Sequence, residues 1–201
     1  MDIIISPEKA DVQECDILIT GLFEDERPLK GTSGWIDWRL HGMLSRFLLE
    51  DKLTGHWKER ILIPSHNKIT PKLILLFGLG KTQDYSYLHV REVFPFFVET
   101  LRNLRSSALC FSLPYGQAYN VDCGKLAEVL IEGLADCLDQ YPNDSQWFEN
   151  LRLFFAEGAE PFSELLLGVK TAKSILEERF NIRIFIPTEE TSETSQVKPN
   201  F

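Results

Sequence analysis

The clearest candidate for chemistry in this sequence is the turn Gly80-Lys81-Thr82, which follows an apolar stretch over residues 72–77. A glycine followed by lysine and a hydroxyl forms the last part of a phosphate-binding loop, but that loop needs another glycine five residues before Gly80. Leu75 occupies that position, which argues against a nucleotide-hydrolysing loop. A glycine-rich turn at the carboxyl end of a buried strand is also where open α/β sheets place ligands. The turn is therefore a candidate binding site, with an ordinary tight turn as the alternative.

A second loop has the same character, because the apolar stretch over residues 107–113 ends in Pro114-Tyr115-Gly116. If both stretches are parallel strands, their loops emerge on the same edge of the sheet, where backbone N–H groups can face an anion. Lys81 would add a positive charge, and Tyr115 could stack on a base or a ribose. The predicted ligand-binding residues are Gly78, Gly80, Lys81, Tyr115 and Gly116.

Metal ligation and nucleophilic catalysis find no support in the sequence. None of the four histidines lies within four residues of another histidine or of a cysteine, so no metal-ligand spacing is present. Cys123 and Cys137 are 14 residues apart on one predicted helix, about 21 Å along its axis, and cannot share an ion. No G-x-S-x-G elbow occurs either. The sequence thus predicts no metal, no cofactor and no catalytic residue.

The composition is that of a globular chain with an acidic surface. Its 201 residues suffice for one substantial core, and the net charge is −9. An acidic surface opposes contacts with phosphate backbones, which predicts no nucleic-acid partner. The longest apolar stretch, residues 73–79, is far below the roughly 20 residues that a membrane span needs. We expect a cytoplasmic protein without a membrane partner, whose four cysteines serve as small core residues.

Apolar periodicity predicts strands that alternate with helices. The predicted strands are 2–6, 15–23, 60–64, 72–77, 107–113, 151–156 and 182–186, and the predicted helices are 35–48, 84–105, 121–141 and 160–180. The strand at 72–77 is the most apolar, and we expect it at the centre of the sheet. Thr32 and Ser33 are expected to cap the first helix, and Gly42 to mark a close neighbour in its middle. Pro95 is expected to kink or restart the second helix.

This alternation predicts an α/β layered domain with a mostly parallel sheet. Several short motifs, in order, resemble the N-terminal domain of leucyl (cytosol) aminopeptidases. They are Pro28-Leu29-Lys30-Gly31, Trp35-Ile36-Asp37, Gly42, Leu44-Ser45, Leu53-Thr54-Gly55, the strand 61–64 and a strand ending in Gly78-Leu79-Gly80-Lys81. The resemblance covers residues 20 to 105 and implies a macro-domain-like, three-layer α/β fold, with a mixed, mostly parallel sheet flanked by helices. We expect one such domain over residues 1–187 and a disordered tail, rich in Thr, Ser and Glu, over 188–201.

The resemblance also bears on function. The metal ligands of leucyl aminopeptidases lie in a C-terminal domain whose signature is similar to NTDAEGRL, and no such string occurs here. The resemblance therefore implies a non-catalytic, stand-alone relative with a binding, regulatory or assembly role, whose partner is a second copy or a separate aminopeptidase chain. One alternative is a module for ADP-ribose or a related nucleotide, because macro-type folds often bind such ligands. Another is one part of a metalloaminopeptidase whose catalytic domain is a separate chain.

Overall fold

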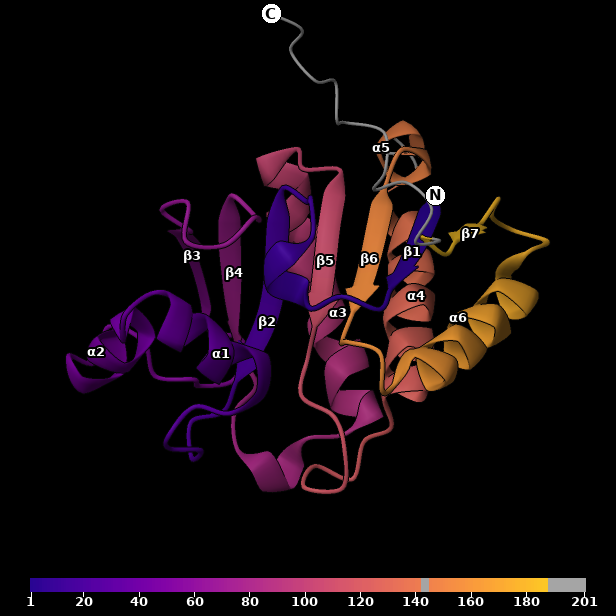
Figure 1. Cartoon of the computed structure of the whole chain (residues 1–201). Helices are drawn as coiled ribbons and strands as arrows, with labels where there is room; N and C mark the ends of the chain where they lie inside the picture. Colours follow the sequence, from indigo (N-terminus) through magenta and orange to yellow (C-terminus); the bar gives the residue numbers. More distant parts are fainter. Residues whose placement is uncertain (142–144, 188–201) are drawn as a thin grey trace, which may run out of the picture.

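The computed structural model describes residues 1–141 and 145–187, and in them a single sheet carries helices on both faces (Figure 1). The strands are β1 Asp2–Ser6, β2 Ile17–Leu22, β3 Arg60–Pro64, β4 Leu73–Gly78, β5 Ala108–Ser112, β6 Arg152–Ala156 and β7 Arg183–Phe185. Their order across the sheet is β3-β4-β2-β5-β6-β1-β7, and all neighbouring pairs are parallel except β3 with β4. The predicted mixed, mostly parallel sheet is confirmed. The tail predicted over 188–201 lies outside the described residues.

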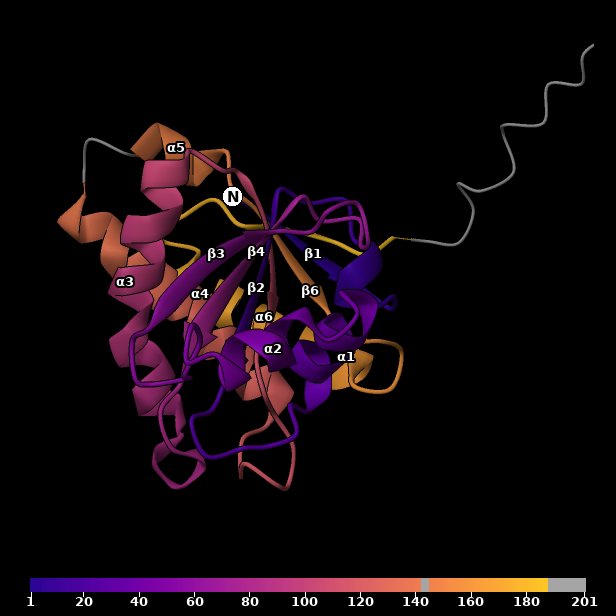
Figure 2. The same ribbon diagram turned by 90° about the vertical axis from the view of Figure 1, so that its left-hand side faces the viewer.

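Two layers of helices cover the sheet, one on each face (Figure 2). The helices are α1 Gly31–Arg39, α2 Met43–Leu49, α3 Tyr87–Leu104, α4 Cys123–Gln140, α5 Ser145–Glu149 and α6 Phe162–Leu176, with short 3-10 turns at Ala10–Val12 and Thr82–Asp84. Side chains alternate along each strand, so β2 sends Ile17 and Ile19 into the core beneath α3, α4 and α6. Its Leu18 and Leu22 enter the second core, beneath α1 and α2. The sheet is therefore buried on both faces, which explains its nearly continuous apolar strands.

Strand β4 is not at the centre of the sheet, as its apolar sequence had suggested. It is the second strand from one edge, and β5 occupies the middle position. Strand β4 is strongly apolar because it is buried on both faces, with Leu75 and Phe77 in one core and Ile74 and Leu76 in the other. Apolar content therefore reports burial on two faces and not position in the order of strands.

The single helix predicted over residues 35–48 is instead two helices, α1 and α2, that meet at Gly42. Gly42 has a φ of 75°, a left-handed conformation that favours glycine. A Cβ at this position would meet nothing within 4 Å, so the prediction that a close neighbour requires this glycine is wrong. Asp37 accepts hydrogen bonds from the backbone N–H groups of Leu44 (2.8 Å) and Ser45 (3.0 Å), and so satisfies the start of α2.

Helix α3 runs through Pro95 without a restart. Proline inside a helix costs about 3 kcal/mol, because it removes a backbone hydrogen bond and crowds the preceding turn. Val93, Phe94, Phe97 and Val98 flank the proline and are all buried in one core. Burial of each large apolar side chain contributes about 1.5–3 kcal/mol, which is enough to hold the helix together across Pro95.

Helices α4 and α6 cross at unusually close range through two glycines. A Cβ on Gly168 would lie 1.9 Å from the backbone oxygen of Gly124, and a Cβ on Gly124 would lie 2.3 Å from the backbone oxygen of Glu164. Only residues without a side chain permit this approach of two backbones. The pair therefore fixes how α6 lies against α4.

Candidate functional site

A pocket of about 540 Å³ opens at the carboxyl ends of β2, β5 and β6, on the face covered by α1. Its floor follows from the register of the strands. Thr20 pairs with Ser112, the pairing of β5 with β6 places Ser112 beside Ala156, and Ala156 pairs with Ser6. Two residues earlier in each strand, the row on the same face has larger side chains, which are Leu18, Cys110, Phe154 and Ile4. The pocket exists because Thr20, Ser112, Ala156 and Ser6 all have small side chains, and we call them the small-residue row.

The first turn of α1 forms one side of the pocket, with Gly31, Thr32 and Ser33 in its lining. Thr32 and Ser33 do not cap the helix as predicted, because α1 begins at Gly31 and both residues already belong to its first turn. The hydroxyls of Thr32 and Ser112 share a hydrogen bond of 2.6 Å, while Ser33 donates to the carbonyl of Lys30 (3.0 Å). The Thr32 bond joins the start of α1 to the small-residue row.

The loop after β1 forms a second side of the pocket, where Asp11 is 4% exposed. One carboxylate oxygen of Asp11 accepts hydrogen bonds from Trp35 Nε1 at 2.9 Å and Arg39 Nε at 3.0 Å. Lys9 Nζ lies 4.7 Å from the centroid of the Trp35 ring, and Trp38 stacks on that ring at 5.0 Å. These contacts fix the Trp35 ring at the mouth of the pocket and pair the charge of Asp11 with that of Arg39.

Tyr115 and Tyr119 form a third side of the pocket, after β5. The Tyr119 hydroxyl donates to Glu26 Oε1 at 2.9 Å, and the same oxygen lies 3.1 Å from Lys30 Nζ. Burial is the main cause that raises the pKa of both tyrosines above the usual value, so both phenols are neutral near pH 7. This side therefore offers aromatic surface and neutral hydroxyls.

Glu157 directly follows β6, is partly buried and lines the pocket. Burial raises the pKa of its carboxyl group to about 8, with the nearby Ser112 hydroxyl acting in the opposite direction. The side chain is therefore mostly protonated at neutral pH, and a protonated carboxyl group can both donate and accept a hydrogen bond. An acid with a strongly shifted pKa in a pocket is a mark of a functional site.

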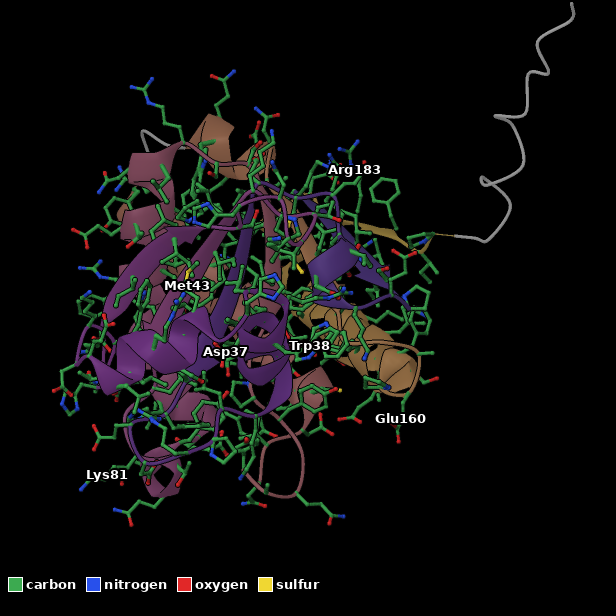
Figure 3. All side chains as sticks on the ribbon, turned by 60° about the vertical axis from the view of Figure 1, so that its left-hand side comes forward. Asp37, Trp38, Met43, Lys81, Glu160 and Arg183 are labelled. Atoms are coloured by element: carbon green, nitrogen blue, oxygen red, sulfur yellow. The ribbon has the colours of Figure 1, made fainter. Side chains whose placement is uncertain are left out.

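The structure brings only part of the predicted site to this pocket. Strands β4 and β5 are both parallel to β2, so the two predicted loops do emerge on the same edge. Tyr115 lines the pocket, whereas Gly78, Gly80, Lys81 and Gly116 do not belong to its lining. Lys81 is exposed and lies at the outer margin of the molecule (Figure 3).

The backbone N–H groups of the three predicted glycines are already used. Gly78 donates to the carbonyl of Glu59 (2.9 Å), Gly80 to that of Gly55 (3.0 Å) and Gly116 to that of Val121 (2.6 Å). These groups are not directed at an anion in this structure, and ligand binding at these glycines stays a prediction.

Sequence reasoning missed Thr20, Ser112, Asp11 and Glu157. A signal for Ser112 was present, because β1, β5 and β6 each end in a small residue. A signal for Asp11 and Glu157 was not, because both lie in loops whose place depends on the fold.

The described residues hold no cluster of three histidine, cysteine or carboxylate side chains that could bind a metal ion. All four cysteines are free and buried, which confirms their predicted place in the core. No helix in the described part of the chain has the length and apolar character needed to cross a membrane.

Comparison with known families gives a match to the N-terminal domain of the cytosol aminopeptidase family over residues 19–143. The chain therefore belongs to the cytosol aminopeptidase family. A probable cytosol aminopeptidase of Alkaliphilus metalliredigens is 22% identical over 191 residues, which cover 95% of this chain and 33% of the relative. The chain spans about a third of the length of this curated relative, and the family match lies in the N-terminal domain alone.

Solved structures agree with this assignment at the level of the fold. A macrodomain of Oceanobacillus iheyensis with ADP superposes with a TM-score of 0.61 at 12% identity, covering 85% of this chain and 90% of that one. A mutant leucine aminopeptidase of tomato superposes with a TM-score of 0.61 at 16% identity, covering 87% of this chain and 36% of the tomato enzyme. The predicted macro-domain-like fold and the resemblance to the aminopeptidase N-terminal domain are both confirmed.

Proposed function

We propose that this member of the cytosol aminopeptidase family is a non-catalytic binding module, and that its pocket takes a nucleotide-type small molecule. The observation that carries the proposal is the pocket of about 540 Å³ at the carboxyl ends of β2, β5 and β6. Small-molecule pockets have volumes of roughly 300–1,000 Å³, and parallel sheets bind ligands at this edge.

The lining of the pocket supports a ligand with a ring and several polar groups. Trp35, Tyr115 and Tyr119 supply aromatic surface, while Thr32, Ser112 and Glu157 supply hydroxyl and carboxyl groups. The similar macrodomain of Oceanobacillus iheyensis was solved with ADP, which makes ADP the first ligand to test. Its identity to this chain is 12%, so the argument for a nucleotide rests on the pocket itself.

Thermal unfolding with ADP, ADP-ribose and NAD tests the proposal. A ligand at 100 times its dissociation constant stabilises the folded state by about 2.7 kcal/mol, which corresponds to a rise in Tm of roughly 5–10 °C for a chain of this size. We expect such a shift for at least one of the three ligands. No shift with any of them at millimolar concentration would reject a nucleotide ligand. The next role to test would then be binding of a protein partner, either a second copy of this chain or a separate aminopeptidase chain.

Two leucine variants test whether the ligand that causes this shift binds in the pocket. Ala156 lies on the floor of the pocket and is 1% exposed, whereas Ala159 is exposed in the following loop. We expect Ala156→Leu to lose the ligand-induced shift and Ala159→Leu to keep it. Tyr115→Ala, a change at the pocket wall, should weaken the shift without filling the floor. A shift that Lys81→Ala removes and Ala156→Leu keeps would move the site to the loop after β4.

The non-catalytic part of the proposal rests on the family match, which covers the N-terminal domain alone. The sequence also has no string similar to the metal-binding signature NTDAEGRL. We expect purified protein to leave leucine amide uncleaved when Zn²⁺ or Mn²⁺ is added, as measured by release of free leucine. Turnover that follows the added metal, and that stays with the protein through further purification, would contradict this expectation.

A further inference from the structure

The first turn of α1 presents unused hydrogen-bond donors to the pocket. Lys30, which precedes the nine-residue helix, has an extended conformation and makes no side-chain cap. Gly34 is the first residue of α1 whose N–H bonds back, to the carbonyl of Lys30 at 3.1 Å. Within the described part of the chain, the N–H groups of Gly31, Thr32 and Ser33 have no acceptor. Such N–H groups and the helix dipole favour a negative charge at this end of the helix.

An independent observation in the same pocket is the Thr20 hydroxyl. Thr20 is 1% exposed and lines the pocket, next to Ser112 in the small-residue row. No described residue forms a hydrogen bond with its side chain, whereas the neighbouring Ser112 hydroxyl is bonded to Thr32. The Thr20 hydroxyl therefore meets the pocket without a protein partner, and an acceptor on a bound ligand can supply one.

The charges that face Glu157 decide whether an anion can enter. Glu157 pairs through its main chain with Lys9, which contributes a positive charge to the lining, while the charge of Lys30, also in the lining, is paired with Glu26 (3.1 Å). Asp11 is paired with Arg39 (2.9 Å). The other titratable groups near Glu157 are Tyr85, Tyr115, Cys110 and Cys123, and burial or hydrogen bonding raises the pKa of each, so all four are neutral near pH 7. Glu157 itself is mostly protonated there, because burial raises the pKa of its carboxyl group to about 8.

We infer that the pocket binds a phosphate group of its ligand between the first turn of α1 and the hydroxyls of Thr20 and Ser112, beside the Glu157 side chain. This inference rests on the proposed function and adds the position of the phosphate group within the pocket. The protonated carboxyl group can donate to a phosphate oxygen, whereas a carboxylate in the same place would repel it. Binding is therefore expected to take up one proton when the pH lies above the pKa of Glu157.

Calorimetric titrations with ADP, adenosine and inorganic pyrophosphate test the position of the phosphate. We expect adenosine to bind at least tenfold more weakly than ADP. Thr20→Val keeps the shape of the side chain and removes the hydroxyl, and it should weaken ADP and pyrophosphate about tenfold, since a hydrogen bond to a charged group is of that strength. The affinity for adenosine should not change. Thr171→Val, on the exposed face of α6, is the control and should change none of the affinities.

The protonation of Glu157 has its own test. The affinity for ADP should fall about tenfold between pH 7 and pH 9, because the protonated fraction of Glu157 falls by that factor. Glu157→Gln stays neutral at both values, so the ratio of wild-type to variant affinity isolates this group from the ionisation of ADP. Heats measured in two buffers of different ionisation enthalpy should give close to one proton taken up by the wild type at pH 9 and none by the variant.

The outcomes separate this inference from the proposed function. Equal affinities for ADP and adenosine, or proton release on binding, would overturn the phosphate position while a nucleotide pocket stands. Binding of pyrophosphate that depends on Thr20, without binding of any nucleotide, would support the phosphate position and reject the nucleotide. Failure of ADP, adenosine and pyrophosphate to bind would overturn both.

Discussion

Replacement of Gly168 by alanine is expected to destabilise the folded chain by about 3 kcal/mol, at the upper end of overpacking effects. The added Cβ would lie 1.9 Å from the backbone oxygen of Gly124 and 2.4 Å from its carbonyl carbon. Backbone atoms cannot rotate away as the end of a flexible side chain can, so α6 must move off α4. In an exposed helix the same change would instead stabilise by about 1 kcal/mol, because alanine favours helix over glycine.

Urea unfolding of Gly168→Ala measures this effect, and Ser174→Ala is the matched control. Ser174 lies on the exposed side of the same helix, so its replacement should leave stability unchanged or slightly higher. A fall in Tm of roughly 6–12 °C for the glycine variant is the thermal counterpart. Equal stability of the wild type and Gly168→Ala would mean that the two helices do not touch as described.

The second large effect concerns Glu157 and pH. Burial raises the pKa of its carboxyl group to about 8 in the folded protein, compared with about 4.3 in an unfolded chain. Between these values the folded state binds more protons than the unfolded state, so the free energy of unfolding falls as the pH rises from about 4.3 to 8. The full decrease in the free energy of unfolding is present above pH 8, and none of it is present below pH 4. Its size is about 3–5 kcal/mol, since one unit of pKa difference corresponds to about 1.4 kcal/mol.

Glu157→Gln should remove this loss, because the amide stays neutral at every pH. We expect the variant to be more stable than the wild type by about 3–5 kcal/mol at pH 9 and to differ from it by less than about 1 kcal/mol at pH 5. Glu160→Gln is the control, since Glu160 is exposed on the surface (Figure 3) and should show no such trend. A stability difference between the wild type and Glu157→Gln that does not change with pH would refute a protonated Glu157.

The sequence predicted each strand of the described sheet within two residues, because the apolar runs are dense and are bounded by turns. The local sequence pattern carries no information on the order of strands in the sheet. The position of β4 next to the edge strand β3 could therefore not be predicted from its composition. The break at Gly42 was missed for a different reason. The apolar spacing continues across it from Leu40 to Leu44, and periodicity alone cannot distinguish a glycine inside a helix from a left-handed residue between two helices.

The candidate site was predicted only in part. Gly78, Gly80, Lys81 and Gly116 lie outside the lining of the pocket, and there is a physical reason for this. Both predicted loops lie on the predicted edge, but β2 lies between β4 and β5 and brings its own following segment, with Lys30 and Gly31, to the pocket. Glycines after a strand suggest open N–H groups, yet Gly78 and Gly80 use theirs to bind the segment from Gly55 to Glu59. Tyr115 reaches the pocket because it follows β5, the central strand.

The position of β1 between β6 and β7 bears on how the chain folds during synthesis. Ile3, Ile4 and Ile5 pair with residues 153–155, so this apolar strand has no partner until about 150 more residues have left the ribosome. The strands β2, β3, β4 and β5 can pair earlier, since all lie within residues 17–112. Strand β1 precedes the other described strands in the chain and is thus among the last of them to be buried, and contacts so distant in sequence slow folding. Until β6 arrives, its three isoleucines are exposed to chaperones and to other nascent chains.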